Sequence, residues 1–334
     1  SSTPQPILPT LLGTMTVAAP STPADRLTRE PIGTGPYTLG AWEPGRRIVL
    51  ERFAGYWGET PAVERGLYVW RNESAVRAAM VATGEAGIAP NISPQDATDP
   101  KTDFSYLDSE TVSLRVTHDL PPLSDVRVRK AINLAIDREA MRGTIFSKDV
   151  LLATNLVVPS INGHNPGLVP WPYDPAQAKQ LLADARAAGT PVDRPIVMIG
   201  RLGVYPNATE SMEAMLAMLQ DVGLNVSLQM IEVAQWQATV TKPYAPNRPP
   251  SLMQIMHDNN NGDAVFSVFY KYHSDGAQSD IADPEVDRLI ETAASAVNPE
   301  RRDLYRELFR KLHEDIVSEV MLYHMVGYTR VHPR

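Results

Sequence analysis

The sequence of 334 residues contains no cysteine. This absence excludes disulfide bonds, thiolate metal sites, cysteine nucleophiles and iron–sulfur clusters. Long apolar runs are missing as well, because none approaches the roughly 18–20 residues that a membrane-spanning helix needs. The opening residues, Ser1 to Pro4, have neither the basic start nor the apolar centre of a signal peptide.

Basic residues are also fewer than acidic ones. Lys and Arg number 31 against 39 Asp and Glu, which gives a formal net charge of −8. A protein that binds nucleic acid non-specifically needs a basic stripe to displace counterions, so we expect no nucleic-acid partner. A hydrophobic content of 43% and a charged content of 21% are typical of a globular protein. The length allows two lobes, each with its own core.

Catalytic motifs are the third absence. The sequence has no Gly-x-Ser-x-Gly, no Ser-x-x-Lys with its partner motifs and no His-Glu-x-x-His. Gly40 and Gly45 have the glycine spacing of a phosphate-binding loop, but Arg46-Arg47 stand where Lys-Ser/Thr is needed. The seven histidines are scattered, so His257 and His273 could meet only through tertiary folding. We therefore expect no enzyme, no metal site and no cofactor.

A hairpin is the clearest local pattern, and it lies within residues 31–58. Alternation of Tyr37, Leu39 and Ala41 predicts a first strand, and Arg47–Arg52 predicts a second. Between them, Pro44-Gly45 is typical of a type II turn, since Pro presets φ and Gly accepts a positive φ.

The rest of the chain alternates predicted strands and helices. Asp or Asn before an apolar periodic segment predicts five helix starts, at Asp125, Asp137, Asp174, Asp283 and Asn298-Pro299-Glu300. The arginines that follow Asp125 are expected on the wet side of their helix. Strands are expected at 63–70, 112–116, 195–200, 224–233, 252–256 and 320–325, further helices at 74–83 and 207–223, and a loop at 88–104. This succession predicts a partly parallel sheet with helices on its faces.

One polar run, residues 256–263, follows a predicted strand. It contains His257, Asp258, Asn259, Asn260 and Asp263. Local chemistry allows two interpretations, an Asx-rich surface turn or a loop that binds a ligand.

Two further residues have a similar choice of roles. Arg201 follows a strand, where its planar fork could bind a ligand carboxylate or simply face solvent. Trp236 could line a cleft or fill a core.

Several segments together resemble the peptide/nickel/opine family of solute-binding proteins that serve ABC importers. The matching segments are Gly33–Tyr37, Pro44-Gly45, Tyr56-Trp57-Gly58, Ser124–Asp137, Tyr173–Leu182 and Asp283–Ile290. The resemblance implies an α/β, two-lobed, periplasmic-binding-protein-like fold (type II, Venus-flytrap) with mixed sheets flanked by helices.

The domain order that the resemblance implies has four parts. These are a lead-in at 1–30, part of the first lobe at 31–120, the second lobe at 121–318 and a return strand toward the first lobe at 319–334. Since the Gly-Thr-Gly-Pro-Tyr segment comes late in the family, we expect this chain to open partway through the family pattern.

The resemblance also implies a function. Such a protein captures a small solute between two lobes and delivers it to an ABC permease in the membrane, and we expect the solute here to be a short peptide or peptide-like compound. It would be extracytoplasmic and monomeric. In peptide-binding members an Asp after a strand at this point pairs with the ligand's α-ammonium, which makes Asp258 and Asp263 the candidates, with Asp258 preferred. The neighbouring His257, Asn259 and Asn260, together with Arg201 and Trp236, complete the expected binding residues.

Alternatives to a peptide ligand remain open. Nickel chelates, opines, glutathione and oligosaccharides are carried by proteins of the same type. A solute-sensing or chaperone-like module and an enzyme on a similar scaffold are the rival classes.

Overall fold

The computed structural model describes residues 5–15 and 17–333. The chain divides into two compact units, a larger one centred on Ser105–Tyr328 and a smaller one centred on Leu8–Phe104. The residues from Thr329 onward belong to the smaller unit. This division into units does not test the lobe boundaries expected from the sequence, which stay a prediction.

The larger unit is built on a mixed sheet. Its strand order is β10-β5-β9-β7-β8, and the short β6 also pairs with β10. The bounds are β5 (Asp103–Val116), β6 (Leu151–Leu152), β7 (Ile196–Arg201), β8 (Val226–Ile231), β9 (Ser251–Asp258) and β10 (Glu319–Val331). β7 runs parallel to β8 and β9, whereas β5 is antiparallel to β9. The predicted partly parallel sheet is confirmed.

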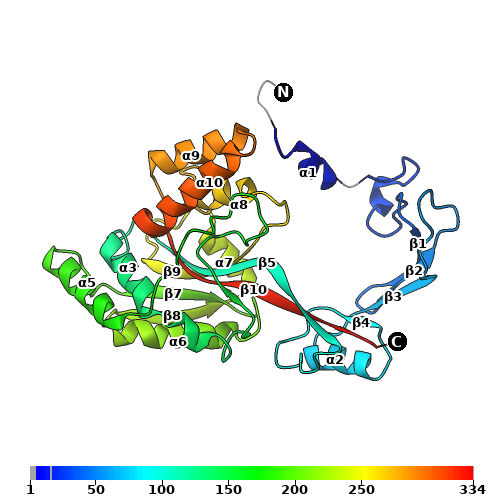
Figure 1. Ribbon diagram of the computed structural model, residues 1–334, viewed down its shortest axis with the longest axis horizontal. Helices are drawn as coiled ribbons and strands as arrows, with labels where there is room; N and C mark the ends of the chain where they lie inside the picture. Colours follow the sequence, from blue (N-terminus) through cyan, green and yellow to red (C-terminus); the bar gives the residue numbers. More distant parts are fainter. Residues whose placement is uncertain (1–4, 16, 334) are drawn as a thin grey trace. The chain divides into compact units, whose positions relative to one another are not determined.

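Helices cover both faces of this sheet (Figure 1). They are α3 (Val126–Ala135), α4 (Arg138–Met141), α5 (Pro175–Ala187), α6 (Ala208–Asp221), α7 (Val233–Val240), α8 (Val265–Tyr272), α9 (Pro284–Ser295) and α10 (Glu300–Arg310), which continues as a π-helical segment, Lys311–Ile316. α3, α5 and α6 share one buried apolar cluster with the sheet, and α8, α9 and α10 share a second. α7 packs a third, small cluster around Trp236.

Side-chain caps are present at four of the five predicted helix starts, among them Asp137, which accepts the N–H of Ala140. The side chains of Asp125, Asp174 and Asp283 each accept a backbone N–H from the first turn of the helix that follows. At Asn298-Pro299-Glu300 a helix does begin, since α10 starts at Glu300, but its N-cap is Pro299 and no side-chain capping hydrogen bond forms.

The expectation that the arginines of α3 are on its wet side is wrong for one of them. Arg127 is partly exposed and pairs with Asp125. Arg129 is buried and donates to the carbonyl oxygens of Leu123 and Ile316. A guanidinium has five donors, so it can replace its hydration with backbone carbonyls inside a fold.

The smaller unit contains the predicted hairpin. β1 (Tyr37–Glu43) and β2 (Arg47–Arg52) pair antiparallel around Gly45, whose φ is +71°. β3 (Arg65–Val69) extends the sheet, in which only Val49 is buried. The other elements are α1 (Leu8–Gly13), a 3-10 turn at Ala24–Arg26, α2 (Ser74–Ala82) and β4 (Ile88–Ala89), which pairs with the last residues of β10.

Several predicted boundaries were wrong. The loop expected at 88–104 contains β4 and the start of β5, and β9 continues through His257 and Asp258. The helices α7 and α8 were not predicted, because their Val, Phe, Thr and Tyr content is typical of strands. Their burial nevertheless has a helical period: in α8 the buried residues are Ser267, Val268, Lys271 and Tyr272.

Candidate functional site

The parallel strands of the larger unit end at one edge of the sheet. β7 ends at Arg201 and β9 ends at Asp258. Because β5 is antiparallel to β9, Glu110 lies directly opposite Asp258 at this same edge. Open α/β sheets bind ligands at the carboxyl ends of their strands. We call Asp108, Glu110, Arg201 and Asp258 the strand-end cluster.

Three carboxylates of the strand-end cluster lack a neutralising contact. Within the described residues, no Lys, Arg or His forms an ion pair with Asp108, Glu110 or Asp258. Directly opposed residues of an antiparallel pair have Cβ atoms about 4.5–5.5 Å apart, so Glu110 and Asp258 repel each other. Burial raises the pKa of Glu110 to about 7, and Asp108 and Asp258 add to this effect while Arg201 opposes it. A bound cation would relieve the repulsion.

Arg201 is held at this edge by Trp236. The guanidinium carbon lies 5.3 Å from the centroid of the Trp236 ring, within the range of a cation–π contact. The indole Nε1 of Trp236 donates to the carbonyl oxygen of Gln254 at 3.0 Å, which fixes the ring. Trp236 therefore belongs mostly to the core, which is one of the two roles predicted for it. It also supports Arg201, the arginine of the cluster.

Asp258 is exposed, and an amide orients it. Asn260 Nδ2 donates to Asp258 Oδ2 at 2.7 Å, and Asn260 Oδ1 accepts a hydrogen bond from Ser109 Oγ at 3.1 Å. This chain of contacts leaves the second carboxylate oxygen of Asp258 without a hydrogen-bond donor among the described residues. Of the predicted acids, Asp258 has the geometry of a ligand-binding group.

His257 and Asn259 have structural contacts instead. His257 points to the opposite face from Asp258, as alternation along a strand requires, and its Nε2 lies 2.7 Å from Ser267 Oγ. Burial and nearby Lys271 lower the pKa of His257 to about 3, so the ring is neutral. Asn259 is 2% exposed, and its Nδ2 donates to Ser267 Oγ and to the backbone oxygen of Asp263.

Asp263 is engaged in a buried ion pair and does not join Asp258. Arg301 donates through Nε to Oδ2 at 2.8 Å and through Nη2 to Oδ1 at 2.7 Å. Asn162 Nδ2 and the backbone N–H of Val265 also donate to this carboxylate. Burial acts to raise the pKa of Asp263, but the hydrogen bonds from Arg301, Asn162 and Val265 outweigh it and lower the pKa. Its oxygens are already occupied, so the geometry disfavours Asp263 as the ligand's partner.

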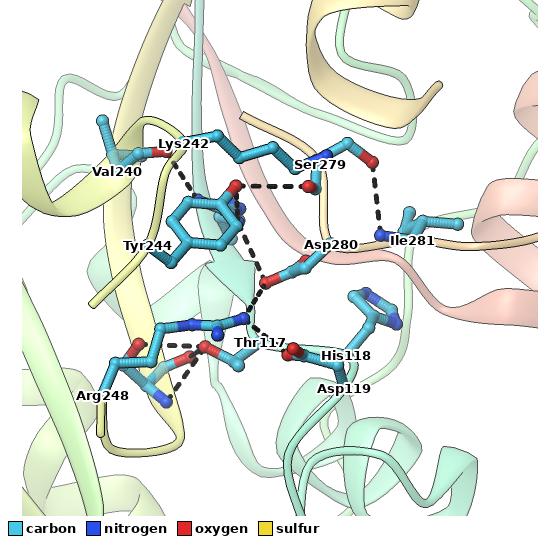
Figure 2. Close-up of polar contacts among 12 residues, drawn as sticks. Thr117, His118, Asp119, Val240, Lys242, Tyr244, Arg248, Ser279, Asp280 and Ile281 are labelled. Atoms are coloured by element: carbon cyan, nitrogen blue, oxygen red, sulfur yellow. Dashed lines mark hydrogen bonds and ion pairs between the residues drawn. The ribbon is translucent and has the colours of Figure 1, made fainter. Parts of the chain in front are cut away.

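The other end of the β5–β9 pair has a different charge arrangement (Figure 2). There Arg115 Nη2 lies 2.9 Å from Asp280 Oδ2, and both side chains are 4% exposed. Tyr244 accepts a hydrogen bond from Arg115 at 2.7 Å, and Arg248 contacts both Asp119, at 2.6 Å, and Asp280, at 3.6 Å. We call these five residues the Arg115 network. Every charge in it has an opposite charge beside it, which is typical of a structural network.

Sequence reasoning missed Asp108, Glu110 and Arg301. The Asp and Glu precede the segment 112–116 that alternates most clearly, and extending that alternation toward the amino terminus was the available signal. Arg301 meets Asp263 across 38 positions of sequence, for which no local pattern exists. Within the described part of the chain, no group of three or more His, Cys, Asp and Glu residues could hold a metal ion.

Comparison with known proteins decides the family. Residues 1–277 match the family described as bacterial extracellular solute-binding proteins, family 5 Middle. The chain belongs to this family. The resemblance inferred from the sequence and its α/β fold are confirmed. Family 5 proteins are periplasmic substrate-binding proteins of transporters and are generally not enzymes. No helix in the described ranges 5–15 and 17–333 has the length and apolarity to cross a bilayer.

Two curated relatives indicate the range of ligands in family 5. The dipeptide-binding protein of Escherichia coli (strain K12) is 25% identical over 319 residues, which are 90% of this chain and 58% of that protein. The glutathione-binding protein GsiB of the same strain is 35% identical over 165 residues, 46% of this chain and 31% of that protein. The chain thus spans little more than half the length of the first relative.

Two solved structures share the fold. HbpA2 from Haemophilus parasuis superposes with a TM-score of 0.81 at 20% identity, over 99% of this chain and 68% of that one. The periplasmic binding protein DppA from Helicobacter pylori, in complex with the peptide STSA, gives a TM-score of 0.75 at 19% identity, over 99% and 67%. At these identities the likeness concerns the fold alone.

Proposed function

We propose that this chain is the solute-capturing part of an ABC importer's binding protein, and that its ligand is a short peptide or peptide-like compound with a free α-amine. The observation that carries the proposal is the strand-end cluster, in which Glu110 and Asp258 oppose each other and neither forms an ion pair with a Lys, Arg or His among the described residues. An ammonium group between or beside them would remove the like-charge repulsion and gain charge-assisted hydrogen bonds.

Arg201 supplies the complementary charge. Its guanidinium is pre-ordered on Trp236 and can bind a carboxylate through two parallel hydrogen bonds. A ligand with an ammonium group at one end and a carboxylate at the other would match this arrangement of charges. The names of relatives support the same class, since the E. coli relative at 25% identity is a dipeptide-binding protein. Glutathione, named in the GsiB relatives, also has a free α-amine.

The residues expected from the sequence remain in the proposal, but their roles differ from one another. Asp258 binds the ammonium, Glu110 joins it, Asn260 orients Asp258, and Arg201 with Trp236 binds the carboxylate. The end of β9 is stabilised by the buried contacts of His257, Asn259 and Asp263. The partner is an ABC permease, the compartment is extracytoplasmic, and the binding protein acts as a monomer. No cofactor enters this scheme.

Thermal unfolding with matched ligands tests the proposal. We expect Ala-Ala to raise the melting temperature, since a ligand at about 100 times its Kd stabilises the native state by about 2.7 kcal/mol. N-acetyl-Ala-Ala, which lacks the ammonium group, should give no shift at the same concentration. Equal shifts with both ligands, or shifts only with nickel chelates, opines or oligosaccharides, would remove the amine from the proposal. Glutathione is the third arm and should resemble Ala-Ala.

A further inference from the structure

A buried ion pair lies just past the turn that follows Asp258 in the sequence. The side chains of Arg301 and Asp263 are 2% and 6% exposed, and two parallel hydrogen bonds join them. Taking two charges out of water is costly, and a well-packed apolar pair of similar volume is often as stable. The bidentate geometry fixes direction as well as distance, which an apolar pair would not do.

Arg301 is itself held by two helices. It is the second residue of α10, and its Nη1 donates to the carbonyl oxygens of Ala293 and Ala294 near the end of α9. Carbonyls in the last turn of a helix have no partner within that helix, so the guanidinium satisfies them. Its guanidinium carbon also lies 5.2 Å from the ring centroid of Tyr305. These contacts hold the Arg301 side chain in one position between α9 and α10.

Asp263 connects Arg301 to the turn 259–262. Its backbone oxygen accepts from Asn259 Nδ2 at 2.9 Å, and its Oδ1 accepts from the N–H of Val265 at the start of α8. The preceding Gly262 has a φ of +70°, and its carbonyl oxygen accepts a hydrogen bond from the N–H of Asn162 at 3.0 Å. Both ends of the turn are thus fixed.

The turn carries the residue that orients Asp258. Asn260, which donates to Asp258 Oδ2 and accepts from Ser109, lies between the two fixed ends. Asn260 is exposed, and within the turn the N–H of Asn261 also donates to Asn259 Oδ1 at 3.1 Å. We propose that Arg301 is a positioning residue for ligand binding, which fixes the turn 259–262 through Asp263 and thereby sets the direction of the Asp258 carboxylate. This inference rests on the proposed function.

The Arg115–Asp280 pair provides a matched control. It has the same chemistry and similar burial, but it belongs to the Arg115 network at the other end of the β5–β9 pair. Glu110 and Arg115 are five residue steps apart along β5, a distance of roughly 17 Å along a strand. Replacing either arginine by lysine keeps the charge and removes the planar fork.

The experiment compares Arg301→Lys with Arg115→Lys. Both variants should melt at a lower temperature than the wild type. Titration calorimetry with Ala-Ala, at a temperature where both are folded, should show about tenfold weaker binding for Arg301→Lys, the loss of one well-oriented hydrogen bond. Arg115→Lys should bind as the wild type does. Unchanged affinity in Arg301→Lys, or an equal loss in both variants, would overturn the proposal.

Hydrogen exchange separates this inference from the proposed function. Amides of residues 259–262 should exchange faster in Arg301→Lys and at the wild-type rate in Arg115→Lys, with or without ligand. If wild-type protein binds no Ala-Ala, the proposed function fails, and the exchange rates alone decide whether Arg301 fixes the turn. Equal exchange in the two variants would refute the positioning role. Where Arg301→Lys does not fold, Asp263→Asn with Asp280→Asn repeats the comparison.

Discussion

The two ends of the β5–β9 strand pair differ in whether their carboxylates form ion pairs. In the Arg115 network, Asp280 lies between two arginines, and a tyrosine hydroxyl completes the contacts. In the strand-end cluster, Glu110 faces Asp258 across the same pair of strands; Arg201 only partly offsets the repulsion at Glu110, and no Lys, Arg or His among the described residues forms an ion pair with either carboxylate.

The difference separates charges used for folding from charges left for a partner. Buried ions that neutralise one another are part of the folded structure, and removing one leaves the other uncompensated. Opposed carboxylates, by contrast, lower stability in the free protein and gain from a cation that arrives later. Proteins depart from local rules of stability chiefly at functional sites. The comparison therefore makes separate predictions for stability and for binding at the two ends.

The largest expected effect is on stability in the Arg115 network. Asp280→Ala should lower the free energy of unfolding by about 3–5 kcal/mol, because it leaves the guanidinium of Arg115 buried and unpaired. Urea unfolding measures this loss. The control is Arg186→Ala, in an exposed pair with Asp193, which should lower stability far less because solvent screens that pair. A loss of that smaller size in Asp280→Ala would show that the network is not needed for folding.

The next effect is on binding in the strand-end cluster. Asp258→Asn should weaken Ala-Ala binding by about 10- to 100-fold, since a hydrogen bond to a charged group contributes about 1.5–3 kcal/mol. Stability should stay the same or rise, because the repulsion with Glu110 is removed. Calorimetric titration and thermal unfolding of the same sample check both parts. Asp221→Asn, in an exposed pair with Lys179, is the control. If the variant binds like the wild type, Asp258 does not contact the ligand.

The pH dependence should distinguish Glu110. Its pKa in the folded protein, about 7, lies above the ordinary value of 4.5. The stability it contributes is therefore complete below the ordinary pKa and is lost as the pH rises through about 7. Asp108, Asp258 and Arg201 are the charged groups that influence it.

Binding of an ammonium ligand should have the reverse trend. Affinity for Ala-Ala should rise between about pH 5.5 and 7.5, because the cation favours ionised Glu110 and the peptide amine remains largely protonated in this range. In Glu110→Gln both pH dependences should become flatter. A wild-type affinity that is constant over this range would exclude Glu110 from the site.

The smallest effect concerns the carboxylate end of the ligand. Arg201→Ala should weaken Ala-Ala binding by about 5- to 10-fold, the loss of one or two hydrogen bonds at a partly exposed position. Binding of Ala-Ala amide, which lacks the carboxylate, should be the same in the variant and the wild type. Equal weakening of both ligands would indicate that Arg201 acts through Trp236 and the local packing instead.

The sequence predicted those features whose causes are local. The caps at Asp125, Asp174 and Asp283 and the Pro44-Gly45 turn each depend on a few neighbouring residues, and all four are present. The strand-end residues depend on pairing between distant strands. Glu110 meets Asp258 only through the β5–β9 register, and Asp263 meets Arg301 only through the packing of α10. Such contacts follow from tertiary structure, so before the fold was known both Asp258 and Asp263 were candidates, with Asp258 preferred.

A crystal structure of the protein with bound Ala-Ala tests the central claim most directly. The account predicts that the peptide's ammonium nitrogen lies within hydrogen-bonding distance, about 2.7–3.2 Å, of an Asp258 carboxylate oxygen. The Asp263–Arg301 pair should remain intact behind it, and the Arg115 network should be unchanged. An ammonium group bound to Asp263, with that carboxylate turned away from Arg301, would contradict the account, as would a peptide bound away from the strand-end cluster.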